Sequence, residues 1–136
     1  MAASGGAEDE DDLRAWLAER GFGKDTTKTL FFNEFGGEYS VFLNPMAYAS
    51  FEGNLNVCRS LYDHGAATNI TKEQGYTPTW WACQQGHLPV CKWLFEMGAR
   101  DISQMDRYGR LPMHKACANG HLSVCKWLFE VGAGAD

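Results

Sequence analysis

One segment of the sequence occurs three times. Residues 75–99 read GYTPTWWACQQGHLPVCKWLFEMGA and residues 109–133 read GRLPMHKACANGHLSVCKWLFEVGA, and the two are identical at 16 of 25 positions. Residues 42–66 form a weaker copy that matches the middle one at nine of 25 positions. The period of 33 to 34 residues is typical of stacked repeats, in which each unit buries its apolar face only against its neighbours. We therefore expect one domain built as a stack of three units.

Each copy carries the signals of a helix, a turn and a second helix. In the middle copy, Thr77 can cap the first helix and Pro78 follows at the first helical position, where its missing N–H costs nothing. Gly86 ends this helix. The next apolar residues fall at a spacing that gives a second helix one apolar face, and Gly98 ends it. A polar link then returns the chain to the next copy.

These fixed spacings resemble those of a known family. The Gly-x-Thr-Pro start, the Gly-His-Leu turn and the closing Gly-Ala of residues 42–136 resemble the ankyrin repeat. The resemblance implies an all-α solenoid of helix-turn-helix pairs that acts as a non-enzymatic scaffold and binds a protein partner through its concave face. His114 keeps the family's histidine, which usually ties neighbouring hairpins together, whereas Ala47 and Trp80 stand at this position in the other copies.

The residues before the first copy are expected to form a cap and an insertion. Residues 13–21 parallel the second helix of the middle copy, so residues 13–20 are expected to form a half-repeat that caps the stack. Residues 30–35 and 38–43 are rich in aromatic residues and flank Gly36 and Gly37, a two-residue turn signal that predicts a β-hairpin. The expected organisation is a disordered acidic tail (1–12), the capping helix and hairpin (13–41), and repeats at 42–74, 75–108 and 109–136.

The acidity of the chain is confined to that tail. Five consecutive acids, Glu8 to Asp12, account for the net charge of −5, and the other 12 acids balance 12 bases. A neutral body weighs against nucleic acid as a partner, because its backbone requires a basic surface. No run of 18 apolar residues predicts a membrane span, and the acidic N-terminus does not resemble a signal peptide. We expect an intracellular protein, cytoplasmic or nuclear.

The five cysteines and four histidines raise the question of a metal or redox site. The chain contains no Cys-x-x-Cys or His-x-x-x-His pair. Cys117 and His114 lie three positions apart, which is ordinary adjacency along a helix, and nothing in the sequence marks an oxyanion hole. A Gly-x-x-x-x-Gly-Lys phosphate loop is also absent. We expect no enzyme, no metal and no cofactor, with core packing as the role of the thiols. The alternative is a thiol-based redox or metal-binding protein that uses the repeat cysteines Cys83, Cys91, Cys117 and Cys125.

The two closest copies differ mainly in the first helix and the segment before it. Their second helices match at 12 of 14 positions, and the resemblance implies that the first helices and the segments before them line the concave surface, where partners usually bind. Tyr, Trp and Arg most often dominate interface energies. The predicted partner-binding residues, called here the strip, are Tyr48, Phe51, Glu52, Tyr76, Trp81, Gln84, Gln85, Tyr108, Arg110, Lys115 and Asn119. The alternative is that Trp80 and Trp81 pack between neighbouring first helices.

The last copy does not have the polar outer face that usually terminates a stack. Its second helix contains Trp127, Leu128 and Phe129 and is as apolar as the internal one. We expect this C-terminal face to be uncapped and to receive either further repeats or a second copy of the chain.

Overall fold

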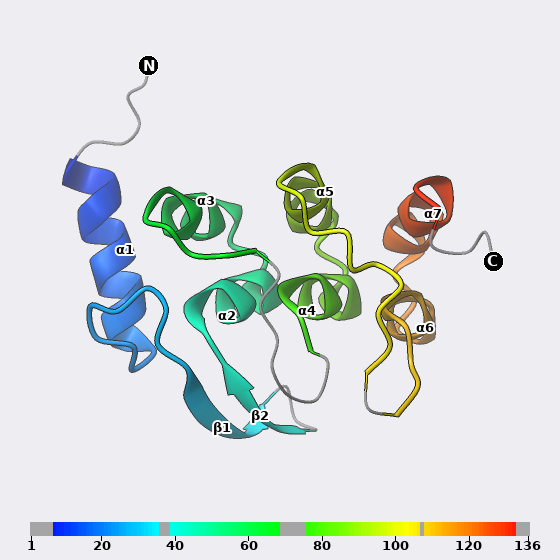
Figure 1. Cartoon of the computed structure of the whole chain (residues 1–136), viewed down its shortest axis with the longest axis horizontal. Helices are drawn as coiled ribbons and strands as arrows, with labels where there is room; N and C mark the ends of the chain where they lie inside the picture. Colours follow the sequence, from blue (N-terminus) through cyan, green and yellow to red (C-terminus); the bar gives the residue numbers. More distant parts are fainter. Residues whose placement is uncertain (1–6, 36–38, 69–75, 107, 133–136) are drawn as a thin grey trace.

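The computed structural model describes residues 7–35, 39–68, 76–106 and 108–132, and its helices form a short stack (Figure 1). None of these helices is long and apolar enough to cross a membrane. The all-α repeat fold with an inserted hairpin is confirmed. The elements are α1 (Ala7–Glu19), β1 (Leu30–Phe35), β2 (Tyr39–Leu43), α2 (Pro45–Glu52), α3 (Leu55–Asp63), α4 (Pro78–Gln85), α5 (Leu88–Glu96), α6 (Pro112–Ala118) and α7 (Leu122–Glu130).

The helix boundaries follow from caps that the sequence supplies. Asn44 accepts a hydrogen bond from the backbone N–H of Ala47 at 2.9 Å, and Thr77 accepts one from the N–H of Trp80 at 3.1 Å. Each cap precedes a proline at the start of α2 or α4. Gly86 ends α4 with a φ of +77°, a conformation that side chains with a Cβ adopt at a cost. The sequence signals therefore act locally as expected.

The helices lie in two rows. The first helices α2, α4 and α6 form one row and the second helices α3, α5 and α7 form the other (Figure 1). Leu61, Leu94 and Leu128 occupy one repeat position in the second helices, and all three are fully buried. The repeated apolar positions thus build one continuous core between the rows, as expected for units that cannot bury their apolar faces alone.

The inserted segment forms an antiparallel hairpin. β1 pairs with β2 so that Leu30 lies opposite Leu43 and Phe32 opposite Val41, with an irregularity before Phe35. The predicted turn at residues 36–37 lies outside the described residues. The ring of Phe32 packs against those of Phe22 and Tyr48. The hairpin therefore adds an aromatic layer to the N-terminal end of the stack.

Helix α1 is longer than expected. It begins at Ala7, so the prediction of a disordered tail through Asp12 is wrong for residues 7–12, while residues 1–6 lie outside the description. The acidic run occupies the first turns of α1, where negative charge favourably opposes the positive end of the helix dipole. The helix packs against α3 and buries Leu13, Trp16 and Leu17. It thereby covers the N-terminal end of the stack.

Candidate binding surface

Three residues of the predicted strip are buried and do not reach the surface. The exposed fraction is 0% for Trp81 and 6% for both Tyr76 and Gln84. The expectation that these three side chains face a partner is therefore wrong for this conformation. The alternative reading, packing between neighbouring first helices, applies to Trp81 as it does to Trp80, which is also 0% exposed.

An aromatic cluster accounts for the burial of Trp81. Its ring packs at 5.8 Å from Phe51 in the preceding first helix and at 5.5 Å from Tyr76. Leu43, at the end of β2, lies in the same cluster. Because the hairpin joins the stack here, the large rings of α2 and α4 have an apolar layer to pack against. The residues equivalent to Trp81 are Tyr48 and Lys115, and Lys115 lies beyond this cluster.

Two strip residues of α2, Tyr48 and Glu52, contact Trp16 of α1 and Arg20 directly after it. The indole N–H of Trp16 donates to Glu52 Oε1 at 2.8 Å, and Nε of Arg20 donates to Oε2 at 2.9 Å. Tyr48 packs edge-on against Trp16 at 5.9 Å, and the Arg20 guanidinium lies 4.6 Å from the indole centroid. Glu52 and Tyr48 therefore fix the cap in place. The spacing of Trp16 and Arg20, four residues apart with Trp16 in α1 and Arg20 directly after it, is the sequence signal that could have indicated this role.

The other strip residues lie on repeats 2 and 3 and remain at least partly accessible. Tyr108 is 61% exposed, Gln85 and Asn119 are exposed, and Arg110 and Lys115 are half-buried. We call these five residues, Gln85, Tyr108, Arg110, Lys115 and Asn119, the open strip. They come from the end of α4, the segment before α6, and α6 with its C-cap.

A buried carboxylate organises the turn that carries Tyr108 and Arg110. Asp106 Oδ1 accepts the backbone N–H groups of Tyr108 and Arg110 at 2.9 and 2.8 Å. Its Oδ2 accepts Nε of Arg110 at 2.9 Å, and the ion pair leaves the Asp106 side chain 0% exposed. The turn closes through Gly109, whose φ is +80° and whose N–H donates to the Asp106 carbonyl at 3.0 Å. Sequence reasoning missed Asp106, although Asp followed three residues later by Gly is a recognised turn signal.

The electrostatics of Asp106 reflect this arrangement. Burial by itself raises the pKa of the carboxyl group, but the backbone and side-chain hydrogen bonds from Arg110, with that from Tyr108, outweigh it and the pKa is lowered. The guanidinium of Arg110 also lies 5.2 Å from the ring centroid of Tyr108 and 5.5 Å from that of Trp80. The carboxylate thus positions one cation and one exposed aromatic ring on a common turn.

Side chains of the helix-turn-helix corners join successive repeats. The ring nitrogen Nε2 of His87 lies 2.9 Å from the carbonyl oxygen of Phe51, and Nδ2 of Asn119 donates to the carbonyl of Gln84 at 3.0 Å. His114, expected from the resemblance to tie hairpins together, instead accepts the backbone N–H of Leu111 at 3.0 Å within its own repeat. The bonds of His87 and Asn119 therefore join the backbone of one first helix to the next repeat.

The thiols divide between the core and the C-terminal end. Cys58, Cys83 and Cys91 are buried, and Cys125 is half-buried. Cys117 is exposed, so its predicted place in the core is wrong. It occupies the same repeat position as Cys83, but no described repeat follows to cover it.

The environment of Cys58, Cys83 and Cys125 disfavours the reactive thiolate form. Burial raises the pKa of Cys58 to about 12, and a hydrogen bond with Cys91 together with burial raises that of Cys83. Burial also raises the pKa of Cys125 to about 11. Reactive cysteines have a lowered pKa. Within the described residues, no three His, Cys, Asp or Glu side chains gather as metal ligands.

Comparison with known proteins agrees with this architecture. A family model described as ankyrin repeats in three copies matches residues 15–106 and, in a second match, residues 46–136. No curated protein matches the chain. Ankyrin repeats generally mediate protein–protein interactions, and the family is typically non-enzymatic. Since the two matches together run from the second half of α1 to the last residue and the helix pairs repeat as described, the chain belongs to the ankyrin repeat family.

Proposed function

We propose that this chain binds a protein partner through the open strip of repeats 2 and 3. The observation that carries the proposal is the turn at Tyr108 and Arg110, which presents an aromatic ring and a guanidinium on a backbone already fixed by Asp106. Tyr and Arg are enriched among the residues that dominate binding energy. A turn ordered before binding loses little conformational entropy when a partner docks, which favours affinity.

The charge of the open strip suggests the chemistry of the partner segment. Arg110 and Lys115 are cationic, and none of the five residues is acidic. The ion pair with the buried Asp106 neutralises the charge of Arg110, so Lys115 supplies the excess positive charge of the open strip. A partner segment that carries a carboxylate near an apolar side chain would complement both Lys115 and the ring of Tyr108. Binding of such a segment weakens as ionic strength rises, because exposed charges are screened.

The experiment starts from partners identified by proximity labelling with the intact chain, whose affinities are then measured with purified proteins. Tyr108→Ala is expected to weaken binding by tenfold or more, about 1.4 kcal/mol or above. The fold should be unaffected, because the Tyr108 side chain is largely exposed. Lys92→Ala, an exposed position of a second helix, is the matched control and should leave affinity unchanged. Equal affinities for wild type and Tyr108→Ala would overturn the proposal.

A further inference from the structure

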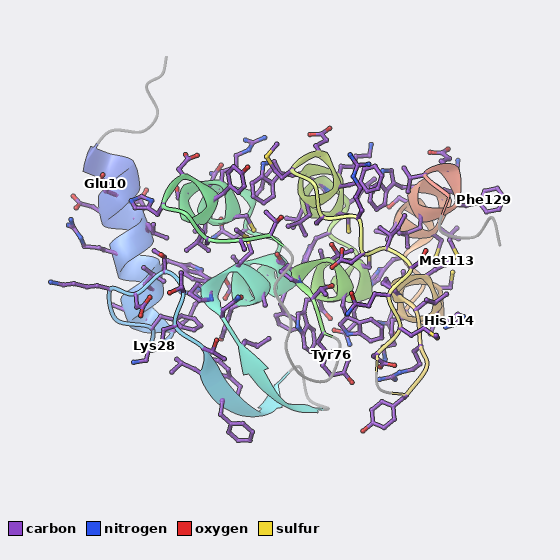
Figure 2. The ribbon with its side chains drawn as sticks, viewed as in Figure 1. Glu10, Lys28, Tyr76, Met113, His114 and Phe129 are labelled. Atoms are coloured by element: carbon purple, nitrogen blue, oxygen red, sulfur yellow. The ribbon has the colours of Figure 1, made fainter. Side chains whose placement is uncertain are left out.

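The last repeat exposes two apolar side chains whose counterparts in repeat 2, Leu88 and Phe95, are half-buried. Leu122 is 74% and Phe129 66% exposed, the two largest values among the described large apolar side chains. Phe129 projects outward from α7 at the C-terminal end of the stack (Figure 2). With Cys117 and Gly120 they define what we call the C-terminal face. This face shares no residue with the open strip.

The position of Phe129 is part of an aromatic contact that recurs between repeats. In repeat 1, Tyr62 packs edge-on against Trp93 of the next repeat at 5.8 Å. In repeat 2, the equivalent Phe95 packs edge-on against Trp127 at 5.6 Å. Phe129 is the third member of this series. By periodicity, a following helix pair would bring a tryptophan against it at the position of Trp127.

A second recurring contact places the histidine ring of one repeat against a glycine of the preceding repeat. A Cβ at Gly53 would overlap the imidazole of His87, and one at Gly86 would overlap that of His121. Glycine at these corners therefore leaves room for a ring from the next repeat. Gly120 has the same conformation, with a φ of +80°, but no described atom lies within 4 Å of the place where its Cβ would stand. The space for a histidine ring is therefore present at Gly120, and no described residue fills it.

We infer that the C-terminal face binds a further ankyrin-type helix pair. The partner unit carries a tryptophan, a histidine and an asparagine at the positions of Trp127, His121 and Asn119, which make the equivalent contacts with repeat 2. This face continues the series of two inter-repeat interfaces of the same design, one between repeats 1 and 2 and one between repeats 2 and 3. On such a unit the asparagine side chain would donate to the carbonyl of Ala118, as Asn119 does to that of Gln84.

In a head-to-tail arrangement, repeat 1 of a second copy of this chain would have to dock on the C-terminal face, and it does not carry the required residues. Its repeat 1 has Ser60 where the tryptophan is needed and Asn54 where the histidine is needed. Helix α1 also lies against α3, on the side of repeat 1 that would have to dock. The occupant must therefore be a unit like repeats 2 and 3, with its docking side open.

The test extends the full chain by one unit, residues 100–132 repeated after Ala133, with both cysteines of the added unit changed to serine. If the added unit docks, Cys117 of the original chain becomes covered, as Cys83 is, and its alkylation rate should fall at least about tenfold. The extended protein should also unfold in one transition at a higher urea concentration. In the matched control, the residues of the added unit that correspond to Trp127 and His121 are both changed to alanine. This control should protect Cys117 much less.

Two results would overturn the inference. One is an extended chain in which Cys117 reacts as fast as before and the added unit unfolds separately. The other is a dimer of the unextended chain, seen by sedimentation, that F129R converts to a monomer, because this assigns the face to a second copy. Since Phe129 is largely exposed in the unextended chain, F129R should not impair folding by itself.

Discussion

Replacing Trp81 with alanine separates a core role from a surface role at this position. The indole is fully buried and packs against Phe51 and Tyr76. Removing a buried Trp side chain typically costs about 3–5 kcal/mol. Each aromatic pair contributes about 0.5–1.5 kcal/mol beyond its buried area. We therefore expect Trp81→Ala to lower the free energy of unfolding by about 4–5 kcal/mol, a large share of the roughly 5–15 kcal/mol of a typical domain.

Lys115 provides the matched control, because it occupies the same repeat position one unit later. Its side chain is half-buried and lies outside the aromatic cluster. Lys115→Ala should lower stability by about 1 kcal/mol at most. Urea unfolding followed by far-ultraviolet circular dichroism measures both variants without depending on tryptophan emission. A loss below about 1 kcal/mol for Trp81→Ala would refute the assignment of this ring to the core.

Three further perturbations test the other assignments. Asp106→Asn should destabilise the chain by about 2 kcal/mol at neutral pH. The folded pKa of Asp106 lies below its unfolded value of about 3.9, so its stabilisation is complete above that value and is lost as the pH falls through the folded pKa. The difference between wild type and variant in urea midpoint should therefore shrink in acid, and a constant difference down to pH 2 would contradict this. Glu52→Gln should speed hydrogen exchange in α1, because the bond to the Arg20 guanidinium loses its charge, whereas the control Glu96→Gln, at an exposed position of α5, should not; identical exchange in both would show that Glu52 does not hold the cap. With a thiol reagent at pH 8, Cys117 should react in the folded protein well before Cys83, and equal rates measured by mass spectrometry would argue against the sealed core.

The helix pairs were predictable because local chemistry determines them. Prolines after Asn44 and Thr77 start the first helices, and Gly53 and Gly86 end them. The hairpin also followed from its own residues, as two aromatic-rich arms around a turn signal. None of these features depends on what lies elsewhere in the stack.

The surface was harder to predict because it depends on neighbours that differ between repeats. Trp81 and Lys115 share one repeat position, yet only Trp81 has the hairpin cluster beside it. Cys83 and Cys117 also share a position, and only Cys83 has a described repeat on each side. The Glu52 carboxylate accepts hydrogen bonds from Trp16 and Arg20, which lie more than 30 residues earlier in the chain. Periodicity assigns equivalent places, but burial follows from the ends of the stack and the insertion.

The unequal ends of the stack have a consequence for how the protein opens. In a linear array each unit is stabilised by its own folding and by its interfaces, so a unit with one interface opens at lower free energy than a unit with two. Repeat 1 lies between repeat 2 and α1, which Glu52 clamps through Trp16 and Arg20. The pair α6 and α7 contacts described helices on one side only. Where no further unit covers the C-terminal face, thermal opening should begin at the pair α6 and α7 and advance toward α1, so proteases would cleave α7 before α3.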